Sequence, residues 1–451
     1  MLTNCRLTID GQVDTYSVPN IVRDVVGPLG DAATVEAKVM ALYHWVRRAL
    51  FVFANNSPGD LQEDYNKALK IINWWGFGLC GTHAKVFGTL VAELLGPANV
   101  RLVGLREREP GSWKTETRGA RAFIWSQRAR DVRPYGGQGH TSLEVFWDGH
   151  WHFLDVMVGF YARRDPGGRI VGIDELIGNR TLVESPVGNP EGDMPYGAEP
   201  EIFCDSNVLY KSVRFNHWPG EPMPLNLRPG ERFTWLAEPM AGAYYLHPQV
   251  RHRYGSDALA PGPRGHRPDR PVPTYGNGEH VLDVTLRPAD DDPFYRRQSN
   301  DWSVPVELPY PVLSLHWRTE PEGTGFLHFP ASTGDELVAL KPIGSHYLPE
   351  SATPGRSYRL ILRAPDGHVG PVRLACRTIV QLNRLVVPQL EAGENTVRLA
   401  AEGEGELRAN VGYRLDGEER TVELAGVGEY RVAVPATGEV APGSITLANP
   451  I

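Results

Sequence analysis

The sequence contains few cysteines, and the four that it has lie far apart. Cys5, Cys80, Cys204 and Cys376 form no C-x-x-C pair, which argues against a zinc knuckle and against a disulfide framework. No run of ~18 consecutive apolar residues occurs, so no membrane-spanning helix is expected. Positive charge is not in excess, because the formal net charge is −8, and nothing indicates a basic surface for nucleic acid. We therefore expect no cofactor, no membrane and no nucleic acid as partners.

The first residues, Met1 to Arg6, lack the basic start and the apolar core of a secretory signal peptide. A cytoplasmic location is the default expectation, and a secreted or periplasmic location is the alternative. The sequence leaves the oligomeric state open.

The chain of 451 residues is longer than one hydrophobic core usually serves, and its composition is that of an ordinary soluble protein. Proline and glycine are concentrated in residues 184–231 and 255–278, which indicates linkers or irregular loops. We predict three regions. Residues 1–200 form a domain of helices and strands, residues 201–340 a mainly β region with a long loop, and residues 341–451 a β-sandwich domain.

Helical patterns are confined to the first of these regions. Asp31 is predicted to N-cap one helix, and Asp60 with Glu63 forms a capping box at the start of a second. A third helix begins near Cys80 and is predicted to end at Gly96, because glycine and proline stop the apolar period there.

Strand patterns surround the helices. Residues 1–27 are predicted as short strands with Asp10-Gly11 as a hairpin turn, Val100 to Leu105 is another strand, and two more flank Asp148-Gly149. Beyond residue 231 the helical period is scarce and short alternating runs recur, a pattern typical of a β-sandwich. The predicted fold class is therefore α+β in the first region, followed by one or more β-sandwich domains.

One cysteine lies at the start of a predicted helix. The turn from Trp74 to Leu79 leads into Cys80, and apolar residues at helical spacing follow it. Unpaired N–H groups and the helix dipole favour an anion there, and such a position lowers a thiol pKa from about 8.5 to roughly 3.5–7.5. The pattern leaves two interpretations open, a nucleophilic thiolate and a small buried apolar side chain.

The hairpin around Asp148-Gly149 is expected to bring a histidine and an aspartate together. Its two-residue loop sets a register in which Ser142 lies opposite Asp155, and His140 is the diagonal neighbour of Asp155 on the same face. A carboxylate on one imidazole nitrogen would leave the other nitrogen to accept a thiol proton. A purely structural ion pair is the alternative.

His150 and His152 are spaced like zinc ligands. Because side chains alternate between the two faces of a strand, these histidines are expected on one face of the hairpin, and His140 and Asp155 on the other. The four side chains therefore do not converge, and we expect no metal site. His150 and His152 are predicted to be surface or packing residues.

A cysteine at a helix start, a histidine on a strand and an aspartate on the next strand together resemble the transglutaminase-like superfamily, which has a papain-like core. The resemblance covers roughly residues 30–160. The matching residues are Gly78-x-Cys80, Gly139-His140 followed by Glu144-Val145, and Trp151-x-x-Leu154-Asp155. The chain departs from the family at Gly81 and Ser142, where relatives often have aromatic residues, and at Val156-Met157, where many have Pro-Thr.

The resemblance implies that residues 1–200 form a catalytic domain. In it Cys80 would be the nucleophile, His140 the general base and acid, and Asp155 the carboxylate that orients the imidazole. The implied activity is hydrolysis of an amide or peptide bond, or transfer of the acyl group. Two alternatives stay open. One is a Cys–His pair that does acid–base chemistry on an acidic glycan, with lyase-like elimination, and the other is an inactive binding or scaffold protein.

Several residues are candidates for contacts with a peptide, amide or glycan substrate. An indole N–H of Trp74 or Trp75 would be a second oxyanion donor beside the backbone N–H of Cys80, with buried packing as the alternative role. Tyr245 and Arg251 belong to a cluster of aromatic and basic residues that suits an acidic or carbohydrate-like ligand, with an ordinary contact between domains as the alternative. The predicted substrate-binding residues are Trp74, Trp75, Ser142, Tyr245 and Arg251.

Overall fold

The computed structural model describes most of the first half of the chain and the C-terminal strands. The described residues are 1–52, 67–75, 77–78, 80–108, 139–157, 159–184, 201–213, 215–217, 219, 225–227, 229–235 and 387–450, together with the backbone of the strands that lie between residues 274 and 382. The predicted capping box at Asp60 and Glu63 falls outside these residues. None of the helices in the described part of the chain has the length and hydropathy that crossing a membrane requires.

Helix α1 (Val18–Val26) occupies a segment that the sequence predicted as strand, and that prediction is wrong. Ser17 caps the helix by accepting a hydrogen bond from the Asn20 N–H, and Pro19 in the first turn has no N–H to leave unpaired. The buried residues follow the helical period, so one continuous apolar face outweighs the strand preference of valine and isoleucine. These buried residues are Val18, Ile21, Val22 and Val26.

Two longer helices, α2 (Val35–Ala49) and α4 (Cys80–Leu95), pack against each other and against α1. Thr34 rather than the predicted Asp31 caps α2, because the Thr34 hydroxyl accepts a hydrogen bond from the Ala37 N–H. Helix α4 begins at Cys80, as predicted, and ends before Gly96, whose φ of 88° favours glycine. Short elements complete this layer: η1 (Gly27–Leu29), α3 (Ala68–Lys70), the π-helix η3 (Ile71–Trp75), η4 (Pro97–Asn99), β2 (Phe51–Val52) and β3 (Phe77–Gly78).

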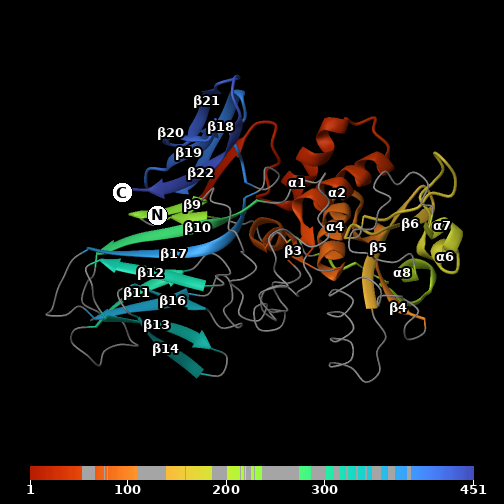
Figure 1. Ribbon diagram of the computed structural model, residues 1–451, viewed down its shortest axis with the longest axis horizontal. Helices are drawn as coiled ribbons and strands as arrows, with labels where there is room; N and C mark the ends of the chain where they lie inside the picture. The colour runs from red at the N-terminus through yellow and green to blue at the C-terminus, as the bar shows by residue number, and fades with distance from the viewer. Residues whose placement is uncertain are drawn as a thin grey trace.

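An antiparallel sheet of order β6-β5-β4-β7 lies beside these helices (Figure 1). Its strands are β4 (Val100–Glu107), β5 (Gly139–Trp147), β6 (His150–Leu154) and β7 (Ser206–Lys211). The predicted hairpin register is confirmed, since Trp147 pairs with His150, and both Asp148 and Gly149 have the positive φ of a two-residue turn. Strand β7 pairs with β4 across the predicted boundary at residue 200.

Each face of this sheet is covered. Leu143 and Val145 of β5 share one buried cluster with α4, and Phe153 of β6 shares another with Phe203 and Phe160. Phe203 lies on one of the short helices that cover the second face (Figure 1). These helices are α6 (Ile173–Leu176), α7 (Arg180–Glu184) and α8 (Glu201–Cys204).

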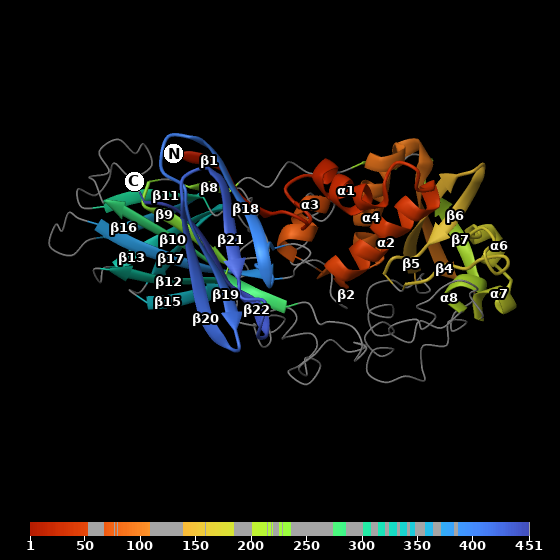
Figure 2. The same cartoon turned by 90° about the horizontal axis from the view of Figure 1, so that it is seen from above.

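The first strand, β1 (Leu2–Ile9), forms no hairpin at Asp10-Gly11. It pairs instead with β18 (Gly393–Gly403) and β8 (Leu225–Leu227), in a sheet of order β21-β18-β1-β8 that β21 (Gly428–Val434) completes. The start of the chain therefore lies in the β-rich part formed by its end, and Figure 2 shows this part beside the helices. Buried residues of β1, such as Leu7 and Ile9, share a core with Ile445 and Leu447.

The remaining strands form two antiparallel sheets (Figure 1). One has the order β15-β12-β17-β10-β9-β22-β19-β20 and the other β11-β16-β13-β14. The bounds are β9 (Glu231–Trp235), β10 (Thr274–Thr285), β11 (Asp301–Glu307), β12 (Ser314–Glu320), β13 (Thr324–Ala331), β14 (Gly334–Leu340), β15 (Ile343–Tyr347), β16 (Ser357–Arg363), β17 (Pro371–Leu382), β19 (Arg408–Leu415), β20 (Glu418–Ala425) and β22 (Val440–Asn449). The α+β class is thus confirmed, with helices grouped in the first half and antiparallel sheets dominating the second.

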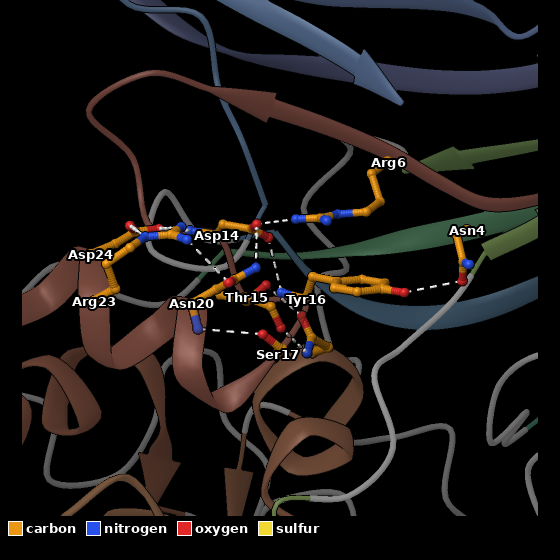
Figure 3. Close-up of polar contacts among 10 residues, drawn as sticks. Asn4, Arg6, Asp14, Thr15, Tyr16, Ser17, Asn20, Arg23 and Asp24 are labelled. Atoms are coloured by element: carbon orange, nitrogen blue, oxygen red, sulfur yellow. Dashed lines mark hydrogen bonds and ion pairs between the residues drawn. The ribbon is translucent and has the colours of Figure 1, made fainter. Parts of the chain in front are cut away.

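Polar side chains form a network of hydrogen bonds in the segment that connects β1 to α1 (Figure 3). Asp14 accepts hydrogen bonds from the Tyr16 N–H at 3.0 Å and from Asn20 Nδ2 at 2.7 Å, and it forms an ion pair with Arg6. The Arg6 guanidinium also lies 4.0 Å from the centre of the Tyr16 ring. This network joins the β-rich part to the helical part of the chain.

A substitution at Gly88 of α4 tests how closely this helix packs against Phe215. Alanine normally favours a helix over glycine by about 1 kcal/mol, but a Cβ at Gly88 would lie 2.6 Å from the Phe215 ring. We therefore expect Gly88→Ala to destabilise the protein by about 1–3 kcal/mol in chemical denaturation. The double variant Gly88→Ala with Phe215→Leu should recover part of that loss, and a Gly88→Ala protein more stable than the parent would contradict this packing.

Candidate active site

Cys80, His140 and Asp155 meet at one edge of the four-stranded sheet. Cys80 is the first residue of α4, His140 is the second of β5, and Asp155 directly follows β6. His140 Nε2 is hydrogen-bonded to Asp155 Oδ2, which confirms the contact predicted from the hairpin register. The imidazole is also hydrogen-bonded to the Cys80 thiol. Because Asp155 occupies Nε2, the nitrogen left for Cys80 is Nδ1.

The three side chains differ in exposure. His140 and Asp155 are 6% and 1% exposed, whereas Cys80 is half-buried. The ring of Phe203 stands edge-on to the imidazole, with 6.2 Å between ring centres, and covers it on the α8 side. Cys80 is therefore the least buried residue of the three.

Charge and hydrogen bonding stabilise a thiolate here. Burial alone would raise the pKa of the Cys80 thiol, but the hydrogen bond and positive charge of His140 and the Thr141 N–H outweigh it and lower the pKa. Burial would lower the pKa of His140, but the charge and hydrogen bond of Asp155, with the contact to Cys80, raise it to about 10. The arrangement therefore favours ionisation of the Cys80 thiol beside a protonated imidazole.

Ser142 does not face a substrate, and the structure corrects that expectation. Its side chain is 2% exposed, and its hydroxyl donates to the Leu154 carbonyl at 2.9 Å. The hydroxyl is thus used inside the hairpin, just behind Asp155. The other predicted contacts are not placed, because Tyr245, Arg251 and the side chains of Trp74 and Trp75 lie outside the described residues.

The two histidines of the zinc-like spacing separate. His150 is exposed, and His152 is fully buried and stacked on Trp147 with 3.6 Å between ring centres. His152 Nδ1 donates to the Ile170 carbonyl at 2.6 Å, which ties the hairpin to the segment before α6. Within the described ranges, no group of three or more His, Cys, Asp or Glu side chains is arranged to hold a metal ion.

Glu144 supports the site from the same face of the sheet. It is 1% exposed, pairs with Arg101 at 2.6 Å and accepts the Ile173 N–H at 2.8 Å. Arg101 in turn lies 3.9 Å from the centre of the Trp151 ring. Glu144 therefore fixes β4, β5 and the start of α6 to one another, which holds the strand that carries His140.

The sequence did not indicate the Thr141 N–H as a donor to Cys80. Every residue except proline has a backbone N–H, so the residue type does not indicate which N–H donates to a given side chain. Only the position of β5 relative to α4 identifies the Thr141 N–H as the donor. A similar limit applies to Tyr43 of α2, whose hydroxyl donates to the Asp155 carbonyl at 3.2 Å.

Comparison with known proteins adds little. The chain matches no family model and no curated protein. Among solved structures it is similar to the crystal structure of Ruminococcus gnavus β-glucuronidase, with 10% identity over 45% of this chain and 37% of that chain, at a TM-score of 0.10. The complex of that enzyme with uronic isofagomine gives 11% identity, the same coverage and a TM-score of 0.09. A similarity at this level supports no argument about fold or function.

The thiolate can be measured by alkylation with iodoacetamide. We expect Cys80 to react rapidly at pH 6–7, where a free thiol with a pKa of about 8.5 is mostly protonated. In His140→Ala the hydrogen bond and charge of the imidazole are lost, and burial then raises the pKa of the Cys80 thiol. Cys80 should therefore react more slowly in this variant than the same thiol in denatured protein. The rates are read by mass spectrometry of the Cys80 peptide.

Cys204→Ser is the control, because Cys204 is also not joined in a disulfide but is buried. This variant should keep the rapid reaction of the parent. Labelling of Cys80 at the rate of the denatured thiol in both the parent and His140→Ala would contradict an activated pair.

Proposed function

We propose that this protein is a cysteine-nucleophile enzyme that hydrolyses an amide or peptide bond or transfers the acyl group to an amine. The observation that supports the proposal is the position of His140, which is hydrogen-bonded to Cys80 through one nitrogen and to Asp155 through the other. Such an imidazole can exchange a proton with the thiol while the carboxylate stabilises its charge and orientation. In this proposal Cys80 is the nucleophile, His140 the general acid and base, and Asp155 the orienting carboxylate.

The proposed reaction has two steps. The Cys80 thiolate attacks the carbonyl carbon, and the new C–S bond places the electron pair of the C=O bond on oxygen, where the Cys80 N–H at the start of α4 is a suitable donor. The intermediate collapses, the C–N bond breaks, and His140 gives its proton to the departing amine. Water or a second amine then attacks the thioester while His140 takes its proton, and the thiolate leaves.

We further propose that residues around this site form a transglutaminase-like core. In its support, a helix that begins at the cysteine is followed by a strand that carries the histidine, and the adjacent antiparallel strand leads to the aspartate. Glycine at 81 and serine at 142 still depart from the family pattern. The substrate class is a peptide or other amide, and an acidic glycan is the alternative.

An active ester tests the nucleophile before the natural substrate is known. With p-nitrophenyl acetate, the parent should release a burst of nitrophenol equal to the enzyme concentration and gain one acetyl group on Cys80. Cys80→Ala should show no burst, Cys204→Ser should behave as the parent, and His140→Ala should acylate at least about 100-fold more slowly. Stopped-flow absorbance and peptide mass spectrometry measure the two signals.

The fate of the acetyl group separates hydrolysis from transfer. Addition of glycine amide should speed turnover and yield acetylated glycine amide if an amine acceptor is used, and should have no effect on a pure hydrolase. A parent enzyme that forms no Cys80 adduct but converts an acidic polysaccharide into products absorbing in the ultraviolet would overturn the proposal in favour of elimination.

A further inference from the structure

The aspartate of the site is held by its own main chain rather than by the sheet. Strand β6 ends at Leu154, and the chain turns back on itself immediately after Asp155. The Asp155 N–H donates to the Phe160 carbonyl at 2.8 Å, and the Asp155 carbonyl accepts the N–H groups of Gly159 and Phe160, both at 2.9 Å. The direction of the carboxylate therefore depends on where this turn sits.

Tyr43 of α2 holds the turn from the other side. Its side chain is fully buried, and its hydroxyl donates to the Asp155 carbonyl at 3.2 Å. Burial raises the pKa of Tyr43, so the hydroxyl stays protonated and remains a donor. The Tyr43 ring packs edge-on against Phe87 of α4 and against Tyr161, with 5.8 Å between ring centres in both pairs. One side chain thus touches the helix that begins at Cys80 and the turn that carries Asp155.

Arg47, one turn further along α2, completes the support. Its guanidinium carbon lies 5.7 Å from the centre of the Tyr43 ring, as the spacing of four residues allows. It also lies directly over Gly159, where a Cβ would come within 2.2 Å of Arg47 Cζ. Gly159 has a φ of 77°, so both its conformation and the close guanidinium favour glycine at this place in the turn.

We propose that Tyr43, with Arg47 packed beside its ring and against Gly159, is a positioning residue that keeps the Asp155 carboxylate on His140. The inference rests on the proposed function. The Tyr43 hydroxyl donates to the main chain of Asp155, so it acts through Asp155. A small shift of the turn would lengthen the carboxylate–imidazole contact, weaken the imidazolium and raise the thiol pKa in turn, and misplacement by ~1 Å can cost an enzyme about 100-fold in rate.

The variant Tyr43→Phe tests this, because it removes the hydroxyl and keeps the ring. The readout is the pH profile of Cys80 alkylation, which a purely structural role would not move. We expect the midpoint to shift to higher pH, in the same direction as in Asp155→Asn but by less. The p-nitrophenyl acetate burst should slow by about 3- to 10-fold, the size of effect that one hydrogen bond supports.

Tyr161→Phe is the matched control. It removes a hydroxyl from the ring that packs against Tyr43, and its alkylation profile should equal that of the parent. Arg47→Lys is a second test, because lysine keeps the charge but loses the planar guanidinium that packs near the Tyr43 ring and against Gly159. Its midpoint should also shift upward, while Arg48→Lys at the exposed neighbouring position should leave the profile unchanged. If Tyr43→Phe does not fold, Arg47→Lys decides the question alone.

The outcomes separate this inference from the function on which it rests. An upward shift in Asp155→Asn with unchanged profiles in both Tyr43→Phe and Arg47→Lys would overturn the positioning role and leave the enzyme proposal standing. A parent protein whose Cys80 titrates like a denatured thiol, with no change in Asp155→Asn, would overturn the enzyme proposal itself.

Discussion

A thiolate can be held at the start of α4 because a protonated imidazole stands beside it. Burial opposes both charges, since it raises the thiol pKa and lowers the imidazole pKa. The pair is stable as ions only when each charge has its partner and the imidazolium has Asp155 on its far side. Everything that keeps these three groups in line therefore has a direct effect on the charge state of the sulfur.

The fold provides that alignment from several directions. Packing of β5 against α4 fixes His140 relative to Cys80, and the ion pair of Glu144 with Arg101 fixes β5 relative to β4. The turn after Asp155 lies under α2, which also packs against α4. The sulfur, the imidazole and the carboxylate thus belong to different elements that share one core, and a shift in any of them changes the electrostatics of the other two.

The sequence predicts the part of the site that depends on local rules. A two-residue Asp-Gly turn sets the strand register, and parity alone then puts His140 and Asp155 on one face. The same alternation predicts Ser142 on that face, but only the folded structure shows that its hydroxyl donates to the Leu154 carbonyl. The pairing of β1 with β18 and the bond from Tyr43 to Asp155 join residues far apart in the chain, and no pattern in either segment signals them. Helix α1 was missed because its valines favour strands, whereas its capping and buried face favour a helix.

The central claim is that Cys80 is a thiolate at neutral pH because of His140, and ultraviolet absorbance of the thiolate measures this without any reagent. The difference between the absorbance of the parent and that of Cys80→Ser, followed against pH, gives the ionisation of this one sulfur. We expect a midpoint below the value of about 8.5 for a free thiol, and a return to a higher midpoint when His140→Ala is introduced into both proteins. A midpoint at or above 8.5 in the parent would contradict it.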